Sequence, residues 1–384
     1  MRLERARLIL PVVLALTEVG ARAEAPSFAS PGPYPVGVKT VVLVDPARQD
    51  PYVEGGRTLV TEIWYPAVDE ARQGKTTRFV DFFGDHPEAA DAFVRYFGGN
   101  LEDVNRRFVT RGVRGAPLRQ GKFPLLVFSH GNGGLRHQNV FQMDHLASHG
   151  YIVASPDHIG NAGVTVLASK VVPYDRKGRG RSTMDRPRDL SFIIDSLSSP
   201  SSGELAWLRG AVDAESVGLL GHSFGGFASC QAAAADKRVK AILPMTVVGP
   251  KPAPVPCMVM LGELDRTIGE AGNMLDKAYF ASAGPPKHLL ILKRGGHFSF
   301  SDMDKINPSF GDGIGTETKR GKTVTFLPPE LTKEIIKAYT LAFFECYLRK
   351  SSEAREFLQR NAYPEEMEYR CVMAEGSPAK TSSP

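Results

Sequence analysis

Val217-Gly-Leu-Leu-Gly-His-Ser-Phe-Gly-Gly226 is the stretch that decides the fold. Apolar residues lead into the turn at 221–225, and an alanine-rich run over 227–235 follows it. This order predicts a strand, a sharp turn and a helix, with Ser223 at the apex. In that setting Gly-x-Ser-x-Gly is typical of a nucleophile elbow, whose glycines let strand and helix approach closely. The pattern alone is weak, because 38 of the 384 residues are glycine.

Other apolar runs alternate with helical patterns along the chain. Such alternation predicts βαβ units, and therefore an α/β fold with a mostly parallel central sheet flanked by helices. The predicted strands are 36–45 and 57–65, expected to form a hairpin at the sheet edge, then 123–129, 151–155, 217–220, 239–243, 255–261 and 289–292. The predicted helices are 138–148, 186–197, 205–212, 227–235, 269–282 and 330–349, and residues 160–184 are expected to form a loop.

A serine hydroxyl becomes an effective nucleophile only when a base removes its proton. His297 is the best candidate for that base, because it follows a predicted strand on a glycine-rich loop, where active sites of parallel sheets form. Asp265 also follows a predicted strand and is the carboxylate expected to orient the imidazole, with Glu263 as the reserve. The order Ser223, Asp265, His297 differs from that of the two best-known serine protease folds.

Acyl transfer also needs two N–H donors for the oxyanion of the tetrahedral intermediate. The amide of Phe224, directly after the nucleophile, is one expected donor. The second is expected in Ser129-His-Gly-Asn-Gly-Gly134, from the backbone of Asn132, because glycines allow a loop to turn its amides inward. A simple strand-to-helix turn would explain the sequence of residues 129–134 equally well.

Among the remaining histidines, His130 and His158 follow predicted strands and could line the pocket, whereas the others carry no special context. His222 precedes the nucleophile and is expected to be a structural neighbour, whereas His145 and His149 are expected on a solvated helix face. No cysteine or histidine has the spacing of a metal site, and the expected chemistry needs neither metal nor cofactor.

The first 23 residues have the three parts of a signal peptide. Arg2, Arg5 and Arg7 give a positive start, residues 8–16 an apolar core, and Ala21-Arg-Ala23 a cleavage site. The expected location is therefore periplasmic or secreted. Removal of residues 1–23 takes away four arginines and two glutamates, so the net charge becomes +5 − 4 + 2 = +3.

The composition is that of a globular, soluble chain, with 42% hydrophobic and 23% charged residues. We expect no nucleic-acid partner, since no basic block or binding motif is present, and no stable membrane insertion. The short basic run at 176–181 is expected to be a solvated loop, although it would also suit an anionic substrate group or a membrane surface.

Four cysteines, Cys230, Cys257, Cys346 and Cys371, follow the leader, and export would permit disulfides. The sequence does not determine their connectivity, but Cys346–Cys371 is the preferred pair because it would pin the tail to the body. Cys230 and Cys257 are expected to pack as small buried hydrophobes.

These patterns divide the chain into a leader (1–23), an extended mature N-terminus (24–35), a catalytic domain (36–350) and a C-terminal extension with a disordered tail (351–384). Residues 79–120 interrupt the domain with a partly helical, aromatic-rich insertion. We expect this insertion to have its own small core. Its aromatic side chains would also suit the lining of an acyl-binding pocket.

The chain resembles the α/β-hydrolase superfamily, specifically the bacterial proteins grouped with platelet-activating factor acetylhydrolase and dienelactone hydrolase. The resemblance covers residues 36–300 and rests on Glu62-Ile-Trp-Tyr-Pro66, Pro124-Leu-Leu-Val-Phe-Ser-His-Gly131, Leu146-Ala-Ser-His-Gly-Tyr-Ile-Val153, Arg186-Pro-Arg-Asp-Leu-Ser-Phe192 and Gly221-His-Ser-Phe-Gly-Gly226. It implies a serine esterase that forms an acyl-enzyme, with an oxyanion hole at Asn132 and Phe224. The substrate class that it implies is a small or lipid-like ester, as in lipid degradation.

One feature departs from the acetylhydrolases. Their eukaryotic members place the catalytic aspartate after the strand that follows the elbow, where this chain reads Ile242-Leu-Pro-Met245. Asp265 comes one strand later, as in dienelactone hydrolases, cutinases and polyester hydrolases, which puts a phospholipid substrate in doubt. Dienelactone hydrolases often use a cysteine nucleophile, so Ser223 favours an ordinary esterase.

Three other classes fit the same residues: a peptidase, an acyltransferase, and a non-catalytic binding protein on a hydrolase scaffold. The intact serine, aspartate and histidine argue against the last. Acyl chain length, the alcohol part of the substrate and the oligomeric state are left open by the sequence.

Overall fold

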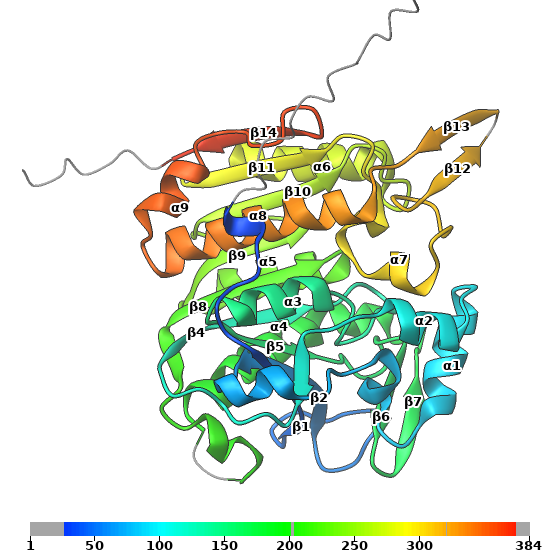
Figure 1. Cartoon of the computed structure of the whole chain (residues 1–384), viewed down its shortest axis with the longest axis vertical. Helices are drawn as coiled ribbons and strands as arrows, with labels where there is room; N and C mark the ends of the chain where they lie inside the picture. Colours follow the sequence, from blue (N-terminus) through cyan, green and yellow to red (C-terminus); the bar gives the residue numbers. More distant parts are fainter. Residues whose placement is uncertain (1–26, 201–202, 320, 374–384) are drawn as a thin grey trace, which may run out of the picture.

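The computed structural model describes residues 27–200, 203–319 and 321–373, and a ten-stranded sheet forms its centre (Figure 1). The strand order is β14-β11-β10-β9-β8-β4-β5-β2-β1-β3. Neighbours from β11 to β5 are parallel, whereas β14 and β2 join this block antiparallel. The strands are β1 (Val36–Asp45), β2 (Arg57–Pro66), β3 (Gly112–Arg114), β4 (Phe123–Ser129), β5 (Ile152–Pro156), β8 (Val212–His222), β9 (Val239–Met245), β10 (Cys257–Gly262), β11 (Lys287–Leu292) and β14 (Met367–Val372).

Helices pack on both faces of the sheet, as the α/β prediction requires. Side chains of β4 alternate between the two faces: Leu126 and Phe128 join one apolar core with α3 and α8, and Leu125 and Val127 join the other with α4, α5 and α6. The helices are α1 (Pro87–Tyr96), α2 (Leu101–Arg107), α3 (Val140–Ser148), α4 (Arg179–Ser198), α5 (Phe224–Ala235), α6 (Gly269–Ser282), α7 (Met303–Ile306), α8 (Pro329–Leu348) and α9 (Ser352–Phe357).

The predicted fold class is confirmed, and the predicted strands lie in the sheet. The hairpin of β1 and β2 lies near one edge, although the short strand β3 pairs outside β1 and forms the edge itself. Because β4, β8, β10 and β11 are parallel, their carboxyl ends lie along one rim of the sheet, and the loops after them lie together there.

The prediction of a loop over 160–184 is wrong in part. Strands β6 (Val164–Leu167) and β7 (Lys170–Pro173) form a separate hairpin in this region. Helix α4 then begins at Arg179, seven residues before the predicted start. Its first turns expose charged side chains such as Arg179 and Arg181, so no apolar stripe in the sequence indicates a helix there.

The C-terminal extension contains two elements that the sequence pattern did not indicate. Helix α9 packs against α8, and β14 adds an antiparallel strand beside β11. In β14, Met367 is buried and Glu368 exposed, an alternation that a charged segment hides from a search for apolar runs. The final residues, 374–384, and the leader lie outside the described residues.

All four cysteines are free thiols, so the preferred pair Cys346–Cys371 is not formed. Pairing of β14 with β11 already attaches the extension to the sheet, and this contact serves the purpose that the disulfide was expected to serve. Burial raises the pKa of the Cys371 thiol to about 11, so the thiol is protonated at neutral pH. Cys230 and Cys257 are buried, as expected.

Residues 79–120 form the predicted partly helical insertion. A 3-10 helix, η3 (Phe79–Phe83), is followed by α1, α2 and the short strand β3. Phe79, Phe82 and Phe83 are buried, and their rings pack around His137.

Two further hairpin strands missed by the sequence pattern, β12 (Thr316–Lys319) and β13 (Lys322–Thr325), project from the body (Figure 1).

Candidate functional site

Ser223 occupies the sharp turn between β8 and α5, with φ 55° and ψ −123°. A positive φ is uncommon outside glycine and marks strain that the surrounding structure must hold. Two backbone bonds do so: the Ser223 amide donates to the Met245 carbonyl at 2.8 Å, and the Ser223 carbonyl accepts from the Gly226 amide at 2.8 Å. Ser223 therefore has the backbone geometry predicted for the elbow, and it lines a cavity of about 370 Å³.

The glycines beside Ser223 leave room for the neighbouring backbone. A Cβ atom at residue 225 would lie 1.8 Å from the Ser129 carbonyl oxygen, and one at residue 221 would lie 2.3 Å from the Gly225 carbonyl oxygen. Both separations are far shorter than van der Waals contact. Glycine is therefore required at both positions for α5 to start against the end of β4.

Asp265 and His297 form a buried pair. His297 Nδ1 lies 2.7 Å from Asp265 Oδ2, and the two residues are 3% and 4% exposed. The other carboxylate oxygen of Asp265 accepts the Ile268 amide at 3.0 Å, which fixes the carboxylate plane. This pairing places the proton on Nδ1 and leaves Nε2 free to accept one.

His297 and Ser223 line the same cavity. His297 begins the 3-10 helix η5 (His297–Phe300), which follows β11, and Asp265 lies in the loop after β10. Glu263, the reserve acid, is exposed and accepts the Arg294 amide at 3.2 Å instead of contacting the histidine. No acidic residue lies in the loop 246–256 between β9 and β10. The histidine instead pairs with Asp265, one strand later.

Residues 130–134, here named the oxyanion loop, pass directly beside the nucleophile. A Cβ atom at Gly131 would lie 3.5 Å from the Ser223 Cβ. The amides of Gly131, Gly133 and Gly134 are already bonded, to the Gln138 side chain and to the carbonyls of Asn161 and Gly131.

The amides of Asn132 and Phe224 differ from their neighbours. Within the part of the chain that the structure describes, neither donates to a protein acceptor. The Asn132 side chain is bonded to Tyr174 and Asn161 at 3.0 Å each, so only its backbone is left to face the site. Both amides are therefore free to donate to a bound group, which is one condition for an oxyanion donor.

His222 is a structural neighbour, as expected. Its Nε2 lies 2.9 Å from the His297 carbonyl oxygen and its Nδ1 lies 2.9 Å from Gln138 Nε2. Burial lowers the pKa of His222 to about 3, so the ring is neutral. Nε2 then donates to the His297 carbonyl, and Nδ1 accepts from the Gln138 side-chain amide. His222 therefore links the loop that contains His297 to the segment just before α3. His145 is buried rather than solvated, and it bonds the Phe28 carbonyl.

The cavity is mainly aromatic. Its lining includes Phe79, Phe93, Phe97 and Phe108 from the insertion and Phe298 from the loop beside His297. Arg179, from the basic run, lies at its edge with an exposed side chain. The insertion was expected to have its own core, with pocket lining as a second interpretation, and its aromatic side chains do line the cavity. The basic run was expected to be a solvated loop, and the contribution of Phe298 was missed, since only the folded chain brings it here.

A second cavity of about 560 Å³ adjoins the first and shares Phe93, Phe97, Asn132 and Gly133 with it. Its other walls include Tyr96 of α1 and the β6–β7 hairpin, through Val164 and Val171. Oxyanion-loop residues thus separate two apolar spaces, which suits a substrate with a group on either side of the reacting carbonyl.

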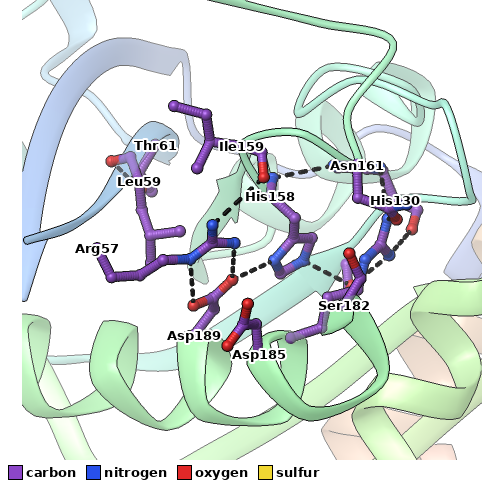
Figure 2. Close-up of polar contacts among 12 residues, drawn as sticks. Arg57, Leu59, Thr61, His130, His158, Ile159, Asn161, Ser182, Asp185 and Asp189 are labelled. Atoms are coloured by element: carbon purple, nitrogen blue, oxygen red, sulfur yellow. Dashed lines mark hydrogen bonds and ion pairs between the residues drawn. The ribbon is translucent and has the colours of Figure 1, made fainter. Parts of the chain in front are cut away.

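The structure contains another Ser-His-Asp set, which the sequence pattern did not indicate. Ser129 Oγ lies 2.9 Å from His158 Nε2, and His158 Nδ1 lies 2.9 Å from Asp189 Oδ2. Arg57 bonds both Asp189 oxygens, at 3.1 and 2.8 Å (Figure 2).

All members of this set are fully buried, and none of them lines either cavity. Burial lowers the pKa of His158 to about 3. The ring is therefore neutral: its Nε2 accepts a hydrogen bond from the Ser129 hydroxyl and its Nδ1 donates one to Asp189. Neither His158 nor His130 lines the pocket, as the sequence had allowed them to do. A substrate carbonyl cannot reach Ser129 here, so this arrangement holds the end of β4 in place.

Among the described residues, no cluster of histidine, cysteine and acidic side chains has the arrangement of a metal site. In the same residues, no helix combines the length and apolar character that crossing a bilayer requires.

Comparisons with known proteins agree with this geometry. Residues 25–175 match the family described as platelet-activating factor acetylhydrolase, isoform II, and residues 124–287 match the alpha/beta hydrolase fold. The chain is 26% identical to the platelet-activating factor acetylhydrolase of Cavia porcellus over 277 residues, which are 61% of this chain and 59% of that protein. It is 29% identical to the Canis lupus familiaris enzyme over 158 residues, or 33% of this chain and 35% of that one.

A solved structure covers more of the molecule. The ferulic acid esterase from Streptomyces cinnamoneus superposes with a TM-score of 0.69 at 25% identity, over 89% of this chain and 98% of that one. The matched acetylhydrolase segments are thus about three fifths of those proteins or less, whereas the likeness to the esterase extends over nearly its whole chain.

Proposed function

We propose that this chain, which has the α/β-hydrolase fold and is related to the platelet-activating factor acetylhydrolase isoform II family, is a serine-dependent carboxylic ester hydrolase. The observation that carries the proposal is the buried Asp265–His297 pair in the same cavity as Ser223. The relatives named as acetylhydrolases and as an esterase support ester cleavage.

The reaction begins when Ser223 Oγ attacks the ester carbonyl carbon and its proton passes to His297 Nε2. The resulting imidazolium is stabilised by Asp265, 2.7 Å from Nδ1. The amides of Asn132 and Phe224 bind the oxyanion, a contribution worth about 2.7–4 kcal/mol for one donor in a comparable enzyme.

Collapse of this intermediate releases the alcohol, which takes the proton from His297. Water then attacks the acyl-enzyme and gives a proton to Nε2, and the second oxyanion occupies the same two amides. When this intermediate breaks down, Ser223 regains its proton and the carboxylic acid leaves. Each half of the reaction uses the same pair of donors and the same base.

The substrate, in this proposal, carries an acyl group larger than acetyl. A cavity of about 370 Å³ with aromatic walls exceeds what an acetyl group fills. The relatives' names span an acetyl ester and an aromatic acid ester, and the lining of Phe79, Phe93 and Phe97 favours the larger, apolar group.

The proposed location is the periplasm or the exterior, on the strength of the positive, apolar and Ala-x-Ala segments of residues 1–23. Expression of the full chain in a Gram-negative host should yield periplasmic protein whose N-terminal sequence begins at Glu24. Cytoplasmic protein that retains Met1 would contradict export.

The choice of nucleophile separates Ser223 from Ser129. Ser223→Ala should lower kcat for p-nitrophenyl butyrate by about 10⁴-fold or more, as removal of a triad serine does, without changing the unfolding temperature much. Ser129→Ala should destabilise the fold by about 1–3 kcal/mol, because it leaves the buried His158 without its donor, but it should keep turnover within about tenfold. The reverse pattern, in steady-state kinetics and thermal unfolding, would show that Ser129 is the nucleophile.

The two acids near His297 give a second matched pair. Asp265→Asn should lower kcat by about 10⁴-fold, because the amide favours the wrong imidazole tautomer. Glu263→Gln, two residues away in the same loop and exposed, should leave kcat unchanged. Steady-state kinetics on both variants tests the assignment, and a large loss confined to Glu263→Gln would transfer the role to that residue.

A panel of p-nitrophenyl esters tests the acyl preference. The kcat/KM should rise from acetate to butyrate by about fourfold for each buried methylene. Phe93→Ala should reduce this rise, since it removes part of the wall. Highest kcat/KM with acetate would refute the proposed acyl preference while leaving the triad intact, and methyl ferulate and a phospholipid in the same panel compare the two named substrate classes.

A further inference from the structure

Arg186 of α4 is a fully buried arginine whose guanidinium bonds no carboxylate. Other buried arginines are paired: Arg57 bonds Asp189, and Arg136 bonds Asp157 and Glu62. Charge is expensive to bury without a partner, so the groups that Arg186 does contact need an explanation.

Arg186 donates to the start of the oxyanion loop. Nη1 lies 2.5 Å from the His130 carbonyl oxygen, and Nη2 lies 3.2 Å from the Gly131 carbonyl oxygen. A planar guanidinium with its donors in a fixed fork holds two successive carbonyls in one orientation. The peptide groups on either side of Gly131 are thereby fixed.

The Gly131 carbonyl and the Asn132 amide belong to the same planar peptide group. A donor on that carbonyl fixes the direction of the N–H at the opposite side of the plane. It also polarises the group, because hydrogen bonds in a chain strengthen one another at low local dielectric. Arg186 therefore acts on the Asn132 amide, one of the two oxyanion donors, without touching the substrate.

His130 reinforces the same carbonyl. Its Nε2 accepts the His158 amide at 3.2 Å, which places the ring proton on Nδ1, and Nδ1 lies 2.6 Å from the Gly131 carbonyl oxygen. Burial and the charge of Arg186 hold the pKa of His130 well below its usual range, so the ring stays neutral. Together with the Gly134 amide, which donates at 3.1 Å, three N–H groups converge on the Gly131 carbonyl oxygen.

Arg186 also contacts the two residues that frame the other side of the hole. Its guanidinium carbon lies 4.7 Å from the centre of the Phe224 ring, a cation–π contact with the residue that supplies the second amide. Nη2 lies 2.5 Å from Asn161 Oδ1, and Asn161 Nδ2 in turn bonds Asn132 Oδ1 at 3.0 Å.

The positive charge of Arg186 is retained at neutral pH. Burial lowers the pKa of its guanidinium to about 9, and the charge of Asp189 opposes that effect. Asp189 is itself paired with Arg57, so its negative charge is not available to neutralise the charge of Arg186. A fixed cation beside the loop stabilises an oxyanion more than a neutral ester carbonyl, which is the condition for accelerating the reaction.

We propose that Arg186 is a positioning residue for the oxyanion hole, which holds and polarises the Gly131–Asn132 peptide group and secures Phe224. This inference rests on the proposed esterase function. It predicts that loss of Arg186 weakens binding of the transition state more than binding of the ester itself.

The test compares Arg186→Met and Arg186→Lys with the control Arg349→Met. Arg349 also donates to two successive carbonyls, those of His149 and Gly150, but neither of these residues lines a cavity, whereas Gly131 does. Active sites are counted by titration with a fluorophosphonate, so that unfolded protein does not lower the apparent kcat. Arg186→Met should lower kcat by about 10- to 100-fold with KM changed less than about threefold, a fraction of the loss for a deleted oxyanion donor. The kcat of Arg186→Lys should lie between those of the wild type and Arg186→Met. Arg349→Met should keep the wild-type kcat.

A transition-state analogue separates this role from a merely structural one. A trifluoromethyl ketone forms a tetrahedral adduct whose oxyanion occupies the hole, so its Ki should rise by the same factor by which kcat/KM falls. The affinity for the corresponding methyl ketone, bound as a ground-state ligand, should stay unchanged. Equal weakening of both ligands, or an unchanged kcat for each active site, would overturn the proposal.

If the Arg186 variants do not fold, Asn161→Ala provides a second test of the same proposal. This neutral change removes one acceptor of the guanidinium and the bond that supports Asn132. It should lower kcat and trifluoromethyl ketone affinity in parallel, and an unchanged kcat would contradict the proposal. If wild-type protein hydrolyses no ester, the proposed function fails; if it does and only Ser223→Ala is inactive, the role of Arg186 alone fails.

Discussion

The close approach of Gly225 to the Ser129 carbonyl is the constraint on which the rest of the site depends. The position of a Cβ atom at residue 225 would be 1.8 Å from that oxygen, so helix α5 starts directly against the end of β4. In the sheet, Ser129 is in register with Gly221 of β8. The elbow and the oxyanion loop therefore leave two adjacent strands at the same level.

The buried polar groups behind this contact keep the end of β4 in place. Ser129, His158 and Asp189 form a chain of hydrogen bonds that resembles a catalytic triad but has no access to either cavity. Its geometry shows why hydrogen-bond order alone does not identify a catalytic serine. Access to a cavity and a strained elbow distinguish Ser223, and the Ser129 set has neither.

Much of the site could be predicted because its signals are local. Ser223 lies in a strand–turn–helix pattern, and Asp265 and His297 each follow an apolar run, so parallel topology was enough to place them at one rim. The role of Arg186 could not be predicted, since it acts on residues 55 and 56 positions away. Strand β14 was missed because exposed charged residues interrupt its apolar positions, and the β6–β7 hairpin was missed because each of its strands has only 4 residues.

Ser223 is the proposed nucleophile, and covalent labelling tests this assignment most directly. The native protein is treated with a fluorophosphonate, digested with a protease and examined by mass spectrometry. We predict a phosphonyl adduct, formed with loss of fluoride, on the peptide that contains Ser223, and no adduct in Ser223→Ala. An adduct on Ser129, or an active protein that resists labelling, would contradict the account.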